Sequence, residues 1–166
     1  MSQRTRIGGF LAVIALAGSA AASAENHASG TFTVDGKPIQ ITQAYAWATK
    51  GFFGPKDDTV VLLCDAAVPP AGVRDPFARR DLVKAGKLHC VQQTIDAAKQ
   101  VIQFRVEHSL FKMTESGGST EQVFDATTLD GKTVAGKSRT KSPQKSFDDL
   151  PYSYDITFSA AIEPKK

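Results

Sequence analysis

Two Asp-Gly pairs, each set between segments of alternating apolar and polar residues, constrain the fold of this chain more than any other feature. The flanking segments are residues 31–34 and 39–47 for Asp35-Gly36, and residues 122–129 and 133–139 for Asp130-Gly131. An Asp-Gly pair supplies the positive φ angles of a tight hairpin turn, whose twist matches that of antiparallel strands. The sequence therefore predicts two β-hairpins and an antiparallel sheet.

Three further segments also predict strands. Residues 59–64 (Thr-Val-Val-Leu-Leu-Cys) are apolar on both faces, which is typical of a central strand covered on both sides. Residues 152–162 alternate, with Tyr154, Ile156 and Phe158 on one face. Residues 87–95 and 101–108 predict another hairpin around residues 96–100.

The register of that last hairpin follows from its polarity pattern. If Ile95 opposes Val101, one face is apolar and the other polar, and a slip of one residue would mix them. The apolar face then holds Leu88, Cys90, Ile102, Phe104 and Val106, and the polar face holds His89, Gln93, Gln103, Arg105 and Glu107. In this register His89 lies opposite Glu107 as an exposed pair.

One segment predicts a helix. Asp75 is a good N-cap, Pro76 suits the first helical position, and Gly86 follows the last turn. Residues 66–73, just before it, form a proline-rich connection. Within the helix, Ala78, Leu82 and Ala85 would face inward while Arg79, Arg80 and Lys84 face solvent. The fold class expected is mainly β: an antiparallel barrel or sandwich of seven to nine strands with one short helix.

The first 24 residues predict an export signal. Arg4 and Arg6 precede an apolar run at residues 7–17, and small residues end in Ala22-Ser23-Ala24. The run is shorter than the roughly 20 apolar residues that span a membrane, which disfavours an anchor. We therefore expect residues 1–24 to be a signal peptide and residues 25–166 to be a single β-rich domain with a mobile N-terminal segment. The expected location is the periplasm or the extracellular space.

Removing this leader also changes the charge. The chain has 166 residues and a formal net charge of +3, which falls to about +1 without Arg4 and Arg6. A nearly neutral protein has no electrostatic reason to bind nucleic acid. No other segment is apolar for long enough to insert stably into a membrane. We expect no nucleic-acid partner and no stable membrane insertion after the leader is removed.

The two cysteines, Cys64 and Cys90, form the clearest constellation. Both lie on predicted strands of an exported chain, and an oxidising compartment favours a disulfide between them. Two alternatives remain: a pair of buried free thiols, since cysteine packs as a small hydrophobe, or a reactive thiol or metal ligand.

Patterns for catalysis or metal binding are absent from the sequence, so we expect no catalytic residue, no metal and no cofactor. The histidines are His27, His89 and His108. His89 and Cys90 are neighbours on a strand, so their side chains point to opposite faces and cannot share one ion. No nucleophile elbow, P-loop or zinc-protease helix is found.

One aromatic cluster is a candidate binding site. Tyr45, Trp47, Phe52 and Phe53 lie close together in the sequence, and Tyr and Trp are enriched at contact surfaces. They would form a rim that binds a ligand or partner, with the proline-rich residues 66–73 nearby. Alternatively, Tyr45 and Trp47 fill the core, because residues two apart on a strand share a face.

Some of these segments resemble known proteins. Residues 30–46 (GTFTVDGKPIQITQAYA) are similar to the opening hairpin of small uncharacterised exported bacterial proteins, and residues 133–137 and 152–158 are similar in kind. The resemblance implies a secreted β-rich domain and carries no activity with it.

The function expected is therefore binding. We expect an exported non-catalytic domain for a small apolar ligand or for an envelope or extracellular protein. A ligand-binding barrel would hold an enclosed apolar cavity of roughly 300–1,000 Å³. The alternatives are a periplasmic hydrolase whose site assembles from scattered residues, with His89 or His108 beside an acid, and an accessory protein of the envelope.

Overall fold

The computed structural model describes residues 26–118 and 120–166, so the expected signal peptide lies outside the described residues. The fold is mainly β, with 53% of residues in strands and 10% in helices, as the sequence predicted. The elements, in chain order, are β1 (His27–Val34), β2 (Lys37–Ile41), β3 (Gln43–Thr49), β4 (Asp58–Cys64), α1 (Pro70–Arg74), α2 (Pro76–Lys84), β5 (Cys90–Ile95), β6 (Val101–Glu107), β7 (Glu115–Gly117), β8 (Gln122–Leu129), β9 (Thr133–Thr140), β10 (Gln144–Lys145) and β11 (Pro151–Glu163).

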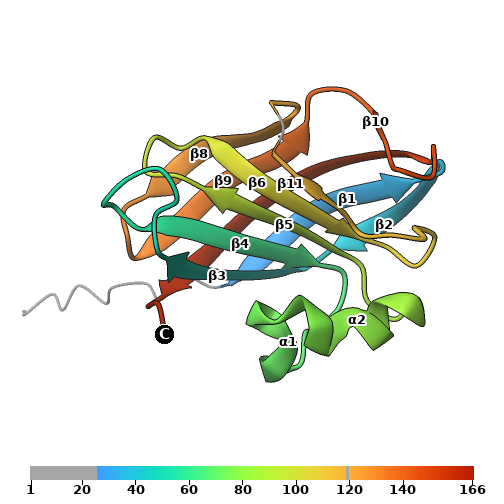
Figure 1. Ribbon diagram of the computed structural model, residues 1–166, viewed down its shortest axis with the longest axis horizontal. Helices are drawn as coiled ribbons and strands as arrows, with labels where there is room; N and C mark the ends of the chain where they lie inside the picture. Colours follow the sequence, from blue (N-terminus) through green and yellow to red (C-terminus); the bar gives the residue numbers. More distant parts are fainter. Residues whose placement is uncertain (1–25, 119) are drawn as a thin grey trace, which may run out of the picture.

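The strands form one open mixed sheet that bends into two layers, a sandwich-like arrangement (Figure 1). One layer contains β2, β1, β11, β9 and β8, and the other contains β3 to β7 in order. β11 belongs to both: it lies between β1 and β9, and its last residues pair in parallel with β3. The described part has eleven strands, not seven to nine, because β7 and β10, with three and two residues, are too short to leave an alternating pattern.

Both Asp-Gly hairpins are confirmed. Asp35 and Gly36 have φ angles of 51° and 72° between β1 and β2, and Gly131 has a φ angle of 83° between β8 and β9. The segment expected to run from residue 39 to 47 is instead interrupted at Thr42. The amide N of Thr42 donates to the carbonyl O of Cys64 at 3.0 Å, where the chain passes from β2 in one layer to β3 in the other.

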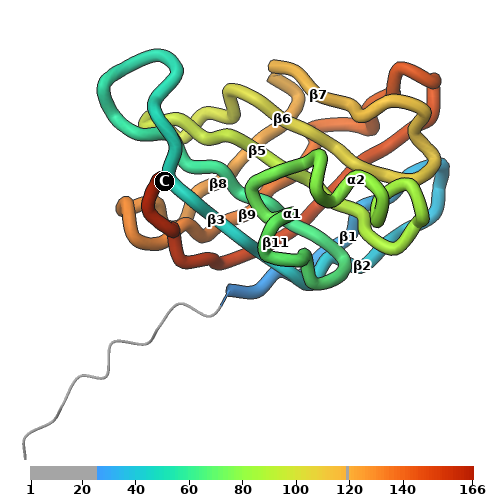
Figure 2. The backbone as a smooth tube through the Cα atoms, turned by 60° about the horizontal axis from the view of Figure 1, so that its bottom comes forward, coloured from blue at the N-terminus to red at the C-terminus, as the bar shows by residue number. Residues whose placement is uncertain are grey.

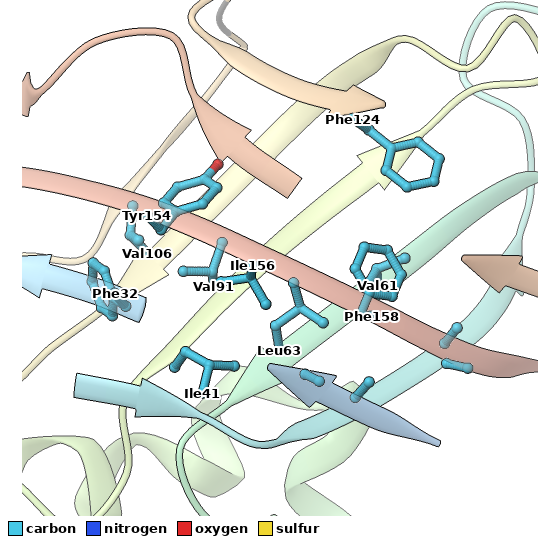
Figure 3. Packing of buried hydrophobic residues seen from close by; sticks show 14 of the residues in the cluster. Phe32, Ile41, Val61, Leu63, Val91, Val106, Phe124, Tyr154, Ile156 and Phe158 are labelled. Carbon is cyan, nitrogen blue, oxygen red and sulfur yellow. The ribbon is translucent and has the colours of Figure 1, made fainter. Parts of the chain in front are cut away.

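The core lies between the two layers (Figure 3). Phe32 of β1, Ile156 and Phe158 of β11, and Val61 and Leu63 of β4 meet there from both sides. The alternate residues of β4 point the other way, and all seven residues of this strand are buried. The expectation of a central strand covered on both faces is confirmed.

The face of β4 that points away from the core is covered by a helical layer, which lies outside β3, β4 and β5 (Figure 2). A smaller apolar cluster lies beneath it, made of Trp47, Val60, Leu62, Cys64, Val68, Val83, Leu88 and Cys90. α2 has the predicted ends: the Asp75 side chain accepts a hydrogen bond from the amide of Phe77, and Gly86 has a φ angle of 65° just past the helix. α1 was not expected and forms within the proline-rich connection. No helix of the described residues is long and apolar enough to cross a membrane.

The inward face of α2 differs in part from the expected one, although Leu82 packs against the cluster beneath the helix as predicted. Arg79 and Val83 are its buried residues, whereas Ala78 and Ala85 are exposed. Apolar periodicity pointed to the alanines, but alanine has little surface to bury. The long Arg79 side chain instead reaches polar partners beneath the helix.

The predicted β5–β6 register is correct at Ile95 and wrong by one residue from Thr94 back to Cys90. Ile95 does oppose Val101, but the pairing shifts between Thr94 and Ile95, so Cys90 opposes Glu107. A β-bulge of this kind adds a residue to one strand and reverses the faces beyond it. Glu107 therefore lies on the helix-covered face beside Cys90, and His89 does not pair with it.

Candidate functional site

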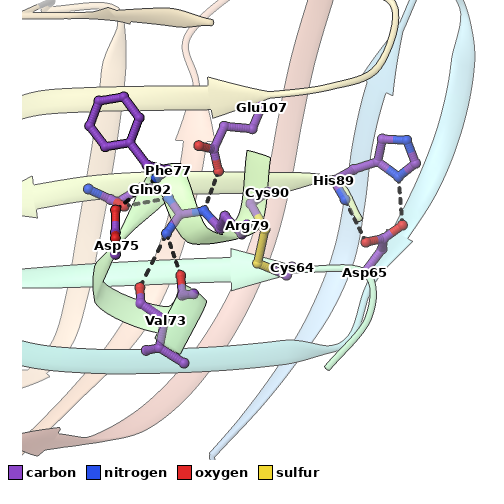
Figure 4. A network of polar contacts seen from close by, with 11 residues as sticks. Cys64, Asp65, Val73, Asp75, Phe77, Arg79, His89, Cys90, Gln92 and Glu107 are labelled. Carbon is purple, nitrogen blue, oxygen red and sulfur yellow. Dashed lines mark hydrogen bonds and ion pairs between the residues drawn. A yellow bond between two sulfur atoms is a disulfide. The ribbon is translucent and has the colours of Figure 1, made fainter. Parts of the chain in front are cut away.

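A disulfide joins Cys64 and Cys90 directly across β4 and β5, as the sequence predicted. Both residues are fully buried, and neither is free. Two polar groups lie on either side of this bond at the end of the two strands (Figure 4). One is centred on Arg79 and the other on His89.

The side chain of Arg79 is completely buried, and each of its nitrogens has a hydrogen-bond partner. Its Nε donates to Glu107 Oε2 at 2.6 Å. Its Nη2 donates to Gln92 Oε1 at 2.9 Å, and its Nη1 donates to the carbonyls of Gly72 and Val73 at 2.9 and 3.2 Å. A buried charge is tolerated only when it is paired and hydrogen-bonded. Arg79 thus ties both helices to β5 and β6.

His89 and Asp65 form the second group. The Nδ1 of His89 lies 2.7 Å from Asp65 Oδ2, and the amide of His89 donates to Asp65 Oδ1 at 2.8 Å. Burial alone would raise the pKa of Asp65, but the hydrogen bonds and charge of His89 outweigh it and leave that pKa below its ordinary value. A carboxylate beside an imidazole orients the ring and fixes its proton, as in many catalytic sites.

The ring of His108 lies against His89, with 4.5 Å between the centroids. Burial, then the charge of His89, lowers the pKa of His108 to about 4, so this ring is neutral near pH 7. Its Nδ1 accepts a hydrogen bond from the amide of Leu110. The group therefore pairs the carboxylate of Asp65 with the imidazole of His89, but no hydroxyl of the described residues hydrogen-bonds that imidazole.

The four aromatic candidates separate in the structure. Trp47 is 8% exposed under the helical layer, and Tyr45 beside it accepts a hydrogen bond from the amide of Val68 at 3.0 Å. Phe52 and Phe53 are more than three-quarters exposed in the β3–β4 loop, where their rings contact each other edge to face. They do not join Tyr45 and Trp47 in one rim.

Tyr45 lines an apolar hollow that we call the α1 cleft. It has a volume of about 480 Å³ and lies between α1 and the end of β11. Its walls are Tyr45, Val68, Pro70, Ala71, Val73, Arg74, Asp75, Glu163 and Lys166. The cation of Arg74 is paired with Glu163 at 2.8 Å and lies 5.8 Å from the ring of Trp47. The proline-rich connection and one of the aromatic candidates therefore share this cleft.

A second hollow, the α2 cleft, lies between α2, the end of β6 and the loop that follows it. Its volume is about 200 Å³. Its walls are Pro76, Phe77, Arg80, Val83, Lys84, Arg105, Glu107, His108, Ser109, Phe111, Lys112 and Thr114. A wider, open groove of about 900 Å³ lies between β6 and β8, and its lining includes Gly118 and Thr120.

Sequence reasoning found the cysteines but missed the polar groups around them. Arg79 carried no signal of burial, because it lies beside Arg80 in a short helix rich in charge. Asp65 gave one faint signal: it follows the buried strand β4 directly, where a polar side chain can bond the next strand. The bulge that redirects Glu107 has no glycine or proline to mark it.

Comparisons with protein-family models, with curated proteins and with solved structures found no match. Among residues 26–118 and 120–166, no three His, Cys, Asp or Glu side chains are grouped as metal ligands would be.

Proposed function

We propose that this protein is an exported, non-catalytic binding domain, and that its ligand is a small uncharged apolar molecule held in the α1 cleft. The observation that carries the proposal is the apolar wall of this cleft, made by Tyr45, Val68, Pro70, Ala71 and Val73. Ligand sites are commonly concave and mainly apolar, with a few polar groups that fix orientation.

In the described part of the chain, the interior between the layers is occupied by a cluster of buried apolar side chains. This favours a cleft outside the sheet over the enclosed cavity expected of a ligand-binding barrel. Charge also favours an uncharged ligand in the α1 cleft. Arg74 is already paired with Glu163, Asp75 is engaged as the N-cap of α2, and Lys166, the remaining charged residue of the wall, is exposed to solvent.

Export is supported by two observations. The disulfide between Cys64 and Cys90 suits an oxidising compartment. The leader-like residues 1–24 carry the expected basic start, apolar run and small-residue end.

The binding proposal can be tested with N-phenyl-1-naphthylamine, an uncharged probe that fluoresces in apolar surroundings. Trp47 is the single tryptophan of the chain and lies beside Arg74 of the cleft, so energy transfer from Trp47 reports probe binding, and cleft variants report where it binds. We expect saturable binding with transfer. Ala71→Phe fills the cleft from an exposed position and should weaken binding about tenfold, which corresponds to ~1.4 kcal/mol.

Ala78→Phe is the matched control, because Ala78 is an exposed helical alanine that lines neither cleft. Its probe affinity should equal that of the unmodified protein. Absence of saturable binding would contradict the proposal, and so would an equal loss in both variants.

The histidine pair favours one other function, hydrolysis, because Asp65 orients His89 at 2.7 Å. Its test is hydrolysis of p-nitrophenyl acetate by the folded protein compared with the same protein in urea. A folded rate well above the unfolded one, abolished by His89→Asn, would support an enzyme. Equal rates would leave binding as the function.

A further inference from the structure

The α2 cleft differs in chemistry from the α1 cleft, and it is a built feature of the fold. Its two walls, α2 and the end of β6, are held together by the buried ion pair of Arg79 and Glu107 at 2.6 Å. Gln92 of β5 supports the same arginine from the side. These buried contacts hold the backbone of α2 against β6, and so they fix the two walls of the cleft relative to each other.

Four cationic side chains line this small hollow. They are Arg80, Lys84, Arg105 and Lys112. The single carboxylate in the lining, Glu107, is neutralised by Arg79 from beneath. His108 adds no charge near neutral pH, because burial and the neighbouring His89 lower its pKa to about 4. The α2 cleft therefore has an excess of positive charge, although the whole protein is almost neutral.

These cations are largely free to bind a ligand. Arg80 meets exposed Asp81 only at 4.0 Å, and the ammonium of Lys112 lies 3.8 Å from Asp148. In both pairs the cation is exposed to solvent, and ion pairs with an exposed cation at such distances contribute little. In the described part of the chain, neither Lys84 nor half-buried Arg105 has an ion-pair partner.

Apolar side chains complete the cleft. Val83 and Phe111 are buried in its wall, and Phe77 is 78% exposed at its edge. An exposed phenylalanine beside unpaired cations suits a ligand with both an apolar part and an anionic group. A volume of about 200 Å³ limits that ligand to a small molecule.

We propose that the α2 cleft is a second binding site, which takes a small organic anion such as an aryl carboxylate. Arg105 donates hydrogen bonds to the carboxylate, and Lys84 and Arg80 add charge at the mouth. The side chain of Phe77 covers the apolar part of the ligand. Arginine suits this role because its planar guanidinium matches both oxygens of a carboxylate.

Phenylacetate tests the proposal, with phenylacetamide as its uncharged counterpart and inorganic phosphate as an anion with no apolar part. Isothermal titration at low ionic strength should show phenylacetate binding at least about tenfold more tightly than phenylacetamide, as expected for a charge-assisted contact. Arg105→Gln should remove about the same factor, and Lys84→Gln a smaller one. Both variants should melt close to the unmodified protein, because neither side chain forms an ion pair in the described structure.

Arg139→Gln is the matched control. Arg139 is a partly exposed strand arginine, as Arg105 is, but it lies on β9 in the other layer and pairs with Asp125. Its removal should leave phenylacetate binding unchanged. The proposal is overturned if phenylacetamide binds as well as phenylacetate, if phosphate binds as tightly as phenylacetate, or if Arg139→Gln weakens binding as much as Arg105→Gln.

This site stands independently of the proposed function. Ala71→Phe should not affect phenylacetate, and Arg105→Gln should not affect N-phenyl-1-naphthylamine, because the two clefts share no lining residue. Either site can therefore fail its test while the other passes.

Discussion

At the scale of single residues, His108 makes stability depend on pH. Burial holds its folded pKa at about 4, below the ordinary value of 6.5. Between pH 6.5 and pH 4 the imidazole is protonated in the unfolded chain but neutral in the folded protein. The free energy of unfolding therefore falls as the pH falls from 6.5 to 4, and it levels off at lower pH. The full effect is about 3 kcal/mol.

We expect His108→Asn to remove most of this loss, since asparagine can still accept the hydrogen bond from Leu110. Urea unfolding at pH 7 and pH 4.5 measures it. Glu115 acts in the opposite direction, because burial raises its pKa, and it is unchanged between the two proteins. An equal pH dependence in both proteins would exclude His108 as the cause.

Arg79 carries the second expectation at this scale. Arg79→Met leaves the carboxylate of Glu107 buried without its partner, which should lower the free energy of unfolding by about 3–5 kcal/mol. Adding Glu107→Met should recover part of that loss, because the pair is then replaced by apolar side chains. Chemical denaturation of the original protein, the single variant and the double variant measures the free energy of unfolding of each. If Arg79→Met is as stable as the original protein, the pair contributes nothing to stability.

At the scale of elements, the disulfide limits how far β4 and β5 can separate on unfolding. It closes a loop with a sequence separation of 26 residues, for which chain entropy gives about 3.5 kcal/mol. Cys64→Ala with Cys90→Ala should lose about this amount in guanidinium unfolding. The reductant dithiothreitol should have no effect on that variant, and a loss below about 1 kcal/mol would contradict the expectation.

Elements were also the level at which sequence reasoning succeeded best. The Asp-Gly turns, the doubly apolar β4 and the capped α2 each have a local physical signal, and each was found. The predicted β5–β6 register was wrong because the bulge at Thr94 depends on packing across the sheet. The burial of Arg79 was not predicted because it depends on a carboxylate from β6, 28 positions along the chain. Long-range polar pairing has no local pattern to reveal it.

At the scale of the whole molecule, the candidate site was predictable only in part. The sequence pointed to Tyr45 and the proline-rich connection, and both line the α1 cleft. It placed Phe52 and Phe53 in the same cluster, whereas the β3–β4 loop carries them away into solvent. The α2 cleft could not be anticipated, because its cations come from a helix, a strand and a loop that meet only in the folded chain.

The position of β11 has a consequence for how this protein is made. β11 is the last strand along the chain, yet it lies between β1 and β9 and also reaches β3. In the described part of the chain, ten strands therefore leave the ribosome before the one that joins them, and until then β1 lacks its β11 neighbour. Until then the core also lacks Tyr154, Ile156 and Phe158. Closure of the core therefore waits for residues 151–163, so the order of synthesis makes β11 the element that completes the fold.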